Sequence, residues 1–188
     1  MIKTSNKIIN ACEEMAIVEG RGFYNLTMEE LAARAGINKR TLYRYFDSKE
    51  DIFSTTIEKI MDGIVAKNVE IFSTNSDIVE IAGKLFKNVA YIANQQVLKD
   101  LETYYPMLWK KIEDFRLDKI ELFINMLINN SKIKMKWRVN PIIAKAVFTA
   151  SIIAVINPHF ILENEMTFEE AGRDLLNMFF FGAVEQTE

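Results

Sequence analysis

The chain of 188 residues has few of the residues that break helices, form disulfides or bind metals: 7 glycines, 3 prolines, one cysteine and one histidine. Because glycine and proline are the main interruptions of regular structure, their scarcity favours helices over sheets. The single cysteine, Cys12, excludes an intramolecular disulfide framework and a cysteine-based zinc site within one chain. We interpret it as a small core residue, and we expect a reducing, cytoplasmic location.

Features of exported, membrane-spanning and catalytic proteins are also missing. Glu13 and Glu14 interrupt the apolar run that a signal peptide would need, and the longest apolar stretches are too short and too charged to cross a bilayer. No nucleophile motif, phosphate loop or metal-ligand spacing is present, and His159 has no second histidine or obvious carboxylate partner. We therefore predict no membrane association, no metal, no cofactor and no enzymatic activity.

Charge is distributed unevenly along the chain. The formal net charge is −3, yet residues 38–49 contain four basic side chains and one acidic side chain, so this stretch is net +3 and the remainder is −6. A compact basic patch on an acidic body is typical of a sequence-selective DNA-binding protein, because the body repels DNA everywhere except at the docking surface.

The first half of the chain has the pattern of a helix-turn-helix. Apolar residues at spacings of three and four predict a helix from Lys3 to Glu19. Thr27 and Glu30 form a capping box at the start of a second helix, and Gly36 is placed to end that helix. Asn38 can cap the next short helix. A helix, a glycine-containing turn and a second short helix form the predicted motif.

Beyond residue 47 the periodicity predicts only helices. Ser48 starts a helix that runs to about Phe72, and Pro141 and Thr167 start two later ones. No segment has the sustained alternation of a strand, so we predict an all-α fold with about four helices before residue 75 and about five after it. The elements expected between residues 78 and 130 are a helix from Ile78 to about Val97, a short helix from Lys99 to Tyr105 ending at Pro106, and an element from Met107 to Asn130 in which a break is allowed.

The short helix after Asn38 has two distinct sides. At 100° per residue, Leu42 and Phe46 share the core side, and the opposite side carries basic, hydroxyl and aromatic groups. Arginine can read guanine bidentately in the major groove, so Arg40 and Arg44 are the candidate base readers, with Thr41 beside them. Lys39, Tyr43 and Tyr45 are candidate phosphate contacts, and the helix starts at Thr27 and Ser48, with Lys49, can hold phosphates at the groove edges. The alternative is that the arginines are solvated charges and the tyrosines pack half-buried.

The span from Ile8 to Ile52, above all LTMEELAARAGINKRTLYRYFDSKEDI, resembles the N-terminal domain of the TetR family of transcriptional regulators. The resemblance implies DNA contacts at the matching motif positions. Arg40 departs from the family's usual small residue. The residues with implied DNA contacts are Thr27, Asn38, Lys39, Thr41, Tyr43, Tyr45 and Lys49.

The same resemblance implies two domains: a helix-turn-helix DNA-binding domain at 1–47 and a helical ligand-binding and dimerisation domain at 48–188, with the helix at about 48–72 connecting them. It also implies a homodimer through the last two long helices. An apolar pocket would suit a small apolar or aromatic ligand, although plain core packing is the commoner role for each lining residue. The candidate lining residues are Phe86, Tyr105, Trp109, Phe123, Met126 and Phe148. The acidic residues Asp100, Glu102 and Glu113 lie near these aromatics and would suit a cation, but charges on helices are usually solvated.

These expectations define a function and two alternatives. The leading hypothesis is a sequence-specific, homodimeric repressor that binds a palindromic operator on double-stranded DNA and is released by its ligand. One alternative is a transcriptional activator of the same fold. The other is a helical ligand-binding or scaffolding protein whose N-terminal domain recruits another protein.

Overall fold

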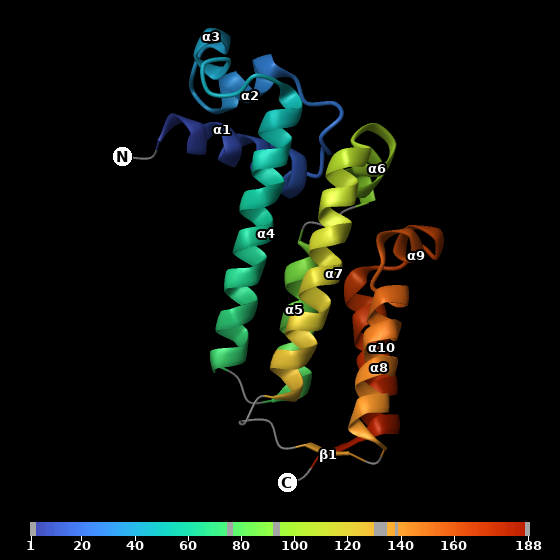
Figure 1. Cartoon of the computed structure of the whole chain (residues 1–188). Helices are drawn as coiled ribbons and strands as arrows, with labels where there is room; N and C mark the ends of the chain where they lie inside the picture. The colour runs from blue at the N-terminus through green and yellow to red at the C-terminus, as the bar shows by residue number, and fades with distance from the viewer. Residues whose placement is uncertain (1–2, 75–76, 92–94, 130–134, 138, 187–188) are drawn as a thin grey trace. The chain divides into compact units, whose positions relative to one another are not determined.

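The computed structural model describes residues 3–74, 77–91, 95–129, 135–137 and 139–186 (Figure 1). The chain forms two compact units, each built from two stretches of sequence. Unit 1 comprises Met1–Val65 and Tyr91–Lys110, and unit 2 comprises Ala66–Ala90 and Lys111–Glu188. The predicted boundary at residue 47 concerns a DNA-binding domain rather than these compact units, and it stays a prediction.

Unit 1 contains the N-terminal helices and a later pair of segments. Its first helix, α1, is continued directly by a π-helical turn, η1, so the predicted helix from Lys3 to Glu19 is present in two parts. The inner face of this pair is buried, including Cys12. The elements are α1 (Thr4–Glu13), η1 (Glu14–Val18), α2 (Met28–Arg34), α3 (Lys39–Leu42), the first part of α4 (Lys49–Thr74), α6 (Gln95–Tyr104) and the start of α7 (Pro106–Ile128).

Unit 2 is also helical, with one short strand pair. The strands β1 (Met135–Trp137) and β2 (Val184–Gln186) are antiparallel, with Lys136 opposite Glu185. Two three-residue strands do not change the class, and the predicted all-α fold is confirmed. The helices wholly within this unit are α5 (Ile78–Ala90), α8 (Pro141–Val155), α9 (Pro158–Glu163) and α10 (Phe168–Ala183).

Helix starts follow the capping residues of the sequence. The side-chain oxygens of Thr27 and Thr167 accept from the backbone N–H groups of the glutamates three positions later, at 3.2 and 3.1 Å. Asn140 caps α8, which has proline at its first position. Since each cap satisfies a backbone donor that the helix leaves free, these short polar residues fix where the helices begin.

The helix bounds predicted between residues 78 and 107 were wrong in two places. The expected single helix from Ile78 to Val97 is divided, because α5 ends at Ala90 and α6 begins at Gln95. The apolar period continues through both helices, and no glycine or proline stands between Ala90 and Gln95, so periodicity alone does not show the division. Pro106 begins α7 as well as following α6, since proline lacks only an N–H that a first helical turn leaves unbonded.

The predicted helix from Met107 is present as α7, which is continuous to Ile128, so the break that the sequence allowed does not occur in the described part; Asn130 lies outside the described residues. Helix α9 was not predicted. It starts where the side chain of Asn157 accepts from the backbone N–H of His159 at 2.9 Å.

Helix α10 packs against α5 and α8 in unit 2. Its Gly172 faces the ring of Phe86 on α5, and a Cβ at this position would lie 2.5 Å from the ring's Cγ atom. Phe86 and the neighbouring Ala171 are buried. The two helices can therefore approach this closely because residue 172 is a glycine, which has no side chain.

Gly172→Ala should lower the free energy of unfolding by about 1–3 kcal/mol, because an added methyl group in a filled space displaces its neighbours. The matched control is Gly83→Ala on α5, where an added Cβ meets nothing within 4 Å. That control should be stabilising by about 0.5–1 kcal/mol through helix propensity. Urea unfolding measures both variants, and equal effects of the two substitutions would contradict the packing described here.

Candidate nucleic-acid interface

The second helix of the motif is short and its end is tightened. Asn38 accepts from the backbone N–H of Thr41 at 2.8 Å, which fixes the start of α3. Regular α-helix ends at Leu42, and the next turn is made by bonds from Arg44 N–H to Thr41 O (3.2 Å) and from Tyr45 N–H to Leu42 O (2.9 Å). The predicted helix to residue 46 is thus an α-turn followed by a tighter i to i+3 turn.

Core and surface sides of this segment agree with the prediction. Leu42 and Phe46 are buried, and Ile37 is half-buried. Tyr43 and Tyr45 are 45% and 48% exposed, so they are surface residues rather than core tyrosines. The outward set consists of Lys39, Arg40, Tyr43, Arg44 and Tyr45, with Thr41 half-exposed.

The two arginines are exposed, and within the described ranges neither forms a hydrogen bond or an ion pair with another side chain. Each guanidinium therefore keeps its donors for a partner outside the chain. Arg40 and Arg44 lie four positions apart, so they are neighbours on one side of the turn.

Lys39 has a partner inside the chain. Its ammonium group forms an ion pair with Glu29 on α2 and lies 5.8 Å from the centre of the Tyr43 ring. The hydrogen bond from Lys39 lowers the pKa of the Glu29 carboxyl group. A phosphate contact by Lys39 would therefore exchange one anionic partner for another.

Thr27 is exposed, but its hydroxyl group is used by the capping box. It donates to Oε2 of Glu30 at 2.8 Å and accepts from the Glu30 backbone N–H. Glu30 also accepts from Arg21 at 2.6 Å, and this bond with those from Thr27 lowers the pKa of Glu30 to about 2. Thr27 thus fixes the start of α2 whatever else it contacts.

Lys49 is half-buried and donates to the backbone carbonyl oxygen of Tyr24 at 2.9 Å. Its ammonium group lies 5.9 Å from the Tyr24 ring centre and 5.6 Å from that of Phe53. Lysine has three N–H donors, so this bond leaves donors for a phosphate. The side chain nevertheless has a structural role that the sequence did not show.

Sequence reasoning missed a second anchor of the Tyr24 segment, Asp100 on α6. The Asp100 side chain is only 2% exposed and accepts from the backbone N–H of Tyr24 at 2.8 Å and from Gln96 at 2.7 Å. The Tyr24 ring stacks on Tyr104 with centroids 3.8 Å apart. Gly22, with a φ of 73°, faces the Asp100 carboxylate so closely that a Cβ there would collide with it.

The expectation that Asp100 is a solvated charge was therefore wrong, because protein donors replace water around it. No local pattern links residues 24 and 100. Glu113 also has a protein partner, Arg116, at 2.8 Å.

The candidate ligand residues are divided between the units. Tyr105 and Trp109 belong to unit 1, and the other four belong to unit 2. Three of the six pack against aromatic rings: Tyr105 edge-on to Phe53 at 5.4 Å, Phe123 with Phe72 at 6.1 Å, and Phe148 with Phe179 at 4.2 Å. These contacts favour core packing, and a ligand contact at any of them stays a prediction.

Among the residues that the structure describes, no helix combines the length and apolar character required to span a bilayer. They also contain no cluster of three or more histidine, cysteine, aspartate or glutamate side chains suited to a metal ion.

A capped helix-turn-helix with unpaired arginines and exposed tyrosines on its second helix defines a DNA-binding protein of the helix-turn-helix class. Residues 15–56 match the family model described as bacterial regulatory proteins, tetR family. A curated relative, the uncharacterized HTH-type transcriptional regulator YvaF of Bacillus subtilis (strain 168), is 23% identical over 180 residues, covering 94% of each chain. Residues 15–56 therefore form a DNA-binding domain of the TetR type, and the chain is similar to this regulator along most of its length.

Solved structures share the fold over nearly the whole length. A transcriptional regulator from Cytophaga hutchinsonii ATCC 33406 superposes with a TM-score of 0.69 at 20% identity, covering 97% of this chain and 98% of that chain. The transcriptional regulator FadR from Bacillus subtilis, in complex with stearoyl-CoA, has a TM-score of 0.57 at 18% identity, covering 94% and 98%. The similarity thus extends beyond the helix-turn-helix into the later helices.

Asp100→Leu should lower the free energy of unfolding by about 2–4 kcal/mol, because the part-buried Tyr24 N–H and the Gln96 amide lose their acceptor. Asp100→Asn keeps one acceptor oxygen and should cost less than half as much. The control is Lys99→Ala, an exposed neighbour on the same helix, which should change stability by less than about 0.5 kcal/mol. A leucine variant as stable as the control in urea unfolding would contradict the anchoring role.

Proposed function

We propose that this TetR-family regulator is a cytoplasmic, homodimeric repressor that binds a palindromic operator and is released when a small apolar or aromatic ligand binds among its later helices. The observation that carries the proposal is the outward side of α3, where Arg40 and Arg44 are exposed and unpaired among the described residues. In the major groove, such side chains can each bind a guanine through two hydrogen bonds.

The remaining residues of the interface would position the protein on the DNA backbone. Tyr43 and Tyr45 present hydroxyl groups on either side of the arginines, and Lys39 and Lys49 add positive charge. Phosphate contacts of this kind set register and affinity without reading sequence. Binding should therefore weaken steeply with salt, since each neutralised phosphate releases counterions.

An exposed apolar stripe on α8 supports the homodimer. Ile143, Val147, Ala150 and Ala154 recur at spacings of four, three and four, and all are exposed. Ile143 and Val147 are 60% and 55% exposed, whereas Ala144 and Phe148 on the opposite side are buried. A second copy would cover this stripe, and its two alanines would allow close approach of the helices.

A ligand can release the protein from DNA only if it binds more tightly to the arrangement that does not bind DNA than to the arrangement that does. A coupling of about 1–3 kcal/mol would change operator affinity roughly 5- to 150-fold. The apolar character of the proposed ligand is supported by the aromatic residues of the later helices and by the stearoyl-CoA that the FadR structure contains. Such a ligand would contact the six candidate residues, which are Phe86, Tyr105, Trp109, Phe123, Met126 and Phe148.

Selection of bound sequences from random DNA tests the DNA-reading role. The parent protein should enrich a palindrome, and Arg44→Ala should lose preference at one position of each half-site, at a cost of about 1–3 kcal/mol. Lys49→Ala should lower affinity for all sequences alike, and Lys87→Ala, which removes an exposed charge on α5, should change nothing. An Arg44→Ala profile identical to that of the parent would exclude base reading by Arg44, and the absence of any enriched sequence would favour a scaffolding protein.

Val147→Glu tests the dimer. A buried pair of carboxylates at a two-fold interface is strongly unfavourable, so the variant should be monomeric at micromolar concentration in sedimentation velocity. Val18→Glu is the control, because Val18 is 65% exposed and lies outside the α8 stripe. It should sediment as the parent does, and a Val147→Glu variant that remains dimeric would exclude this stripe as the interface.

A further inference from the structure

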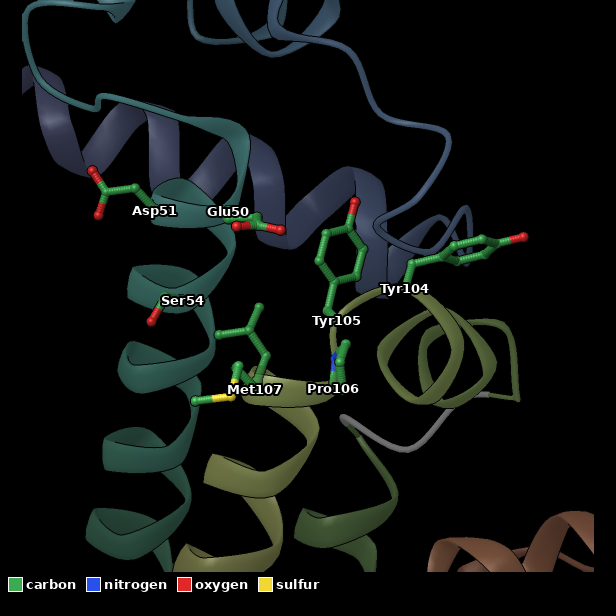
Figure 2. Close-up of a pocket in the computed structure, with 8 residues that line it drawn as sticks. Glu50, Asp51, Ser54, Tyr104, Tyr105, Pro106 and Met107 are labelled. Carbon is green, nitrogen blue, oxygen red and sulfur yellow. The ribbon is translucent and has the colours of Figure 1, made fainter.

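Unit 1 contains a cavity that lies outside the DNA-reading set of residues 39–45 and shares only Tyr105 with the candidate ligand residues. Its volume is about 440 Å³, and it opens between the first turns of α4 and the junction of α6 with α7 (Figure 2). This volume lies within the range of about 300–1,000 Å³ that is typical of small-molecule sites. Its lining residues are Glu50, Asp51, Ser54, Tyr104, Tyr105, Pro106, Met107 and Leu108.

The lining combines an apolar wall with negative charge. Pro106, Met107 and Leu108 provide apolar surface, whereas Glu50 and Asp51 are acidic, and the lining contains no lysine or arginine. Lys49, which precedes Glu50, is directed to the carbonyl oxygen of Tyr24 and is not part of the lining.

The two acidic residues differ in their partners. Asp51 accepts from the backbone N–H of Asp47 at 3.3 Å, so it belongs partly to the start of α4. The Glu50 side chain has no hydrogen bond or ion pair with any other residue in the described ranges. Its carboxylate points toward Tyr105 (Figure 2). The acid available to a ligand is therefore Glu50.

A second, independent group in the lining also lacks a partner. The Tyr105 side chain is 7% exposed, and its hydroxyl group forms no hydrogen bond with the rest of the chain that the structure describes. Burial, followed by the charges of Asp100 and Glu50, raises the pKa of Tyr105 to about 12, so the hydroxyl group stays neutral. No buried side-chain oxygen or nitrogen atom of the described residues lacks a hydrogen-bond partner, so the Tyr105 oxygen is accessible and can accept from a ligand in the cavity.

We propose that this cavity binds a small organic cation with a planar N–H-bearing head, an amidinium or guanidinium group, on an apolar body. The head would donate to the Glu50 carboxylate and to the Tyr105 hydroxyl oxygen, as planar cations do with paired acceptors. The body would lie against Pro106, Met107 and Leu108. The site shares Tyr105 with the proposed apolar ligand residues, but it differs from them in its acidic residues. Its existence does not depend on repression or release.

Benzamidine and benzamide form a matched pair of probes, since they are nearly the same shape and only benzamidine is cationic at neutral pH. In isothermal titration with the full chain, benzamidine should bind saturably and benzamide should bind at least about tenfold more weakly, because hydrogen bonds to charged groups are the stronger ones. Amide shifts in a ¹⁵N-labelled sample should concentrate at Glu50, Ser54 and Tyr105.

Two variants remove the proposed ligand contacts one at a time. Glu50→Gln should weaken benzamidine binding at least about fivefold, and Tyr105→Phe by about threefold, in line with partly exposed ion pairs and single hydrogen bonds. Asp62→Asn is the control, because it removes an exposed acid further along α4 that does not line the cavity. Circular dichroism and thermal midpoints verify that each variant is folded.

Unchanged benzamidine affinity in the folded Glu50→Gln variant would overturn the proposal. The same holds for equal binding of benzamide, for amide shifts confined to residues outside the cavity, and for no saturable binding of benzamidine. None of these results affects the selection of bound sequences from random DNA. The cation site and the proposed function are therefore tested independently.

Discussion

The buried carboxylate of Asp100 is the constraint on which the helix-turn-helix depends. Tyr24, in the segment just before the Thr27 cap, is fixed at three points: its N–H by Asp100, its carbonyl oxygen by Lys49 and its ring by Tyr104. These partners come from α6 and from the start of α4. Because the Asp100 carboxylate is buried, a shift of the segment would leave it without the Tyr24 N–H donor, which is costly. The start of α2, and hence the path into α3, follows from this anchored residue.

The basic residues around α3 differ in whether they have partners inside the chain. Lys39 and Lys49 have partners inside the chain, Glu29 and the Tyr24 carbonyl group, whereas Arg40 and Arg44 have none among the described residues. The paired lysines support the local fold and have donors left for phosphates. The two arginines have no such structural role, so all their N–H donors are available, and we therefore propose that they read the bases.

Local signals in the sequence predicted the motif well. The capping pairs at Thr27 and Thr167 and the left-handed glycine at Gly36 each act within a few residues, so their effects can be read from spacing alone. The division between α5 and α6 was missed because both helices continue one apolar period. The exposed face of α3 was likewise predictable, since Leu42 and Phe46 fix which side is inward.

Contacts between distant residues could not be predicted. Asp100 lies 76 positions from Tyr24, and nothing in either local sequence indicates the other. The grouping of α6 with the N-terminal helices, and the cavity beside Tyr105, depend on the same kind of long-range packing. The need for glycine at position 22 could not be predicted either, because the Asp100 carboxylate that occupies the space of a Cβ there comes from a distant part of the sequence.

Amide hydrogen exchange at Tyr24 tests the central claim most directly, because this N–H is the donor to Asp100. The account predicts exchange slowed by at least about a hundredfold relative to an unstructured peptide, which is typical of an amide that opens only with its structural unit. Exchange at the rate of a free loop amide, in a protein that is otherwise folded, would contradict it.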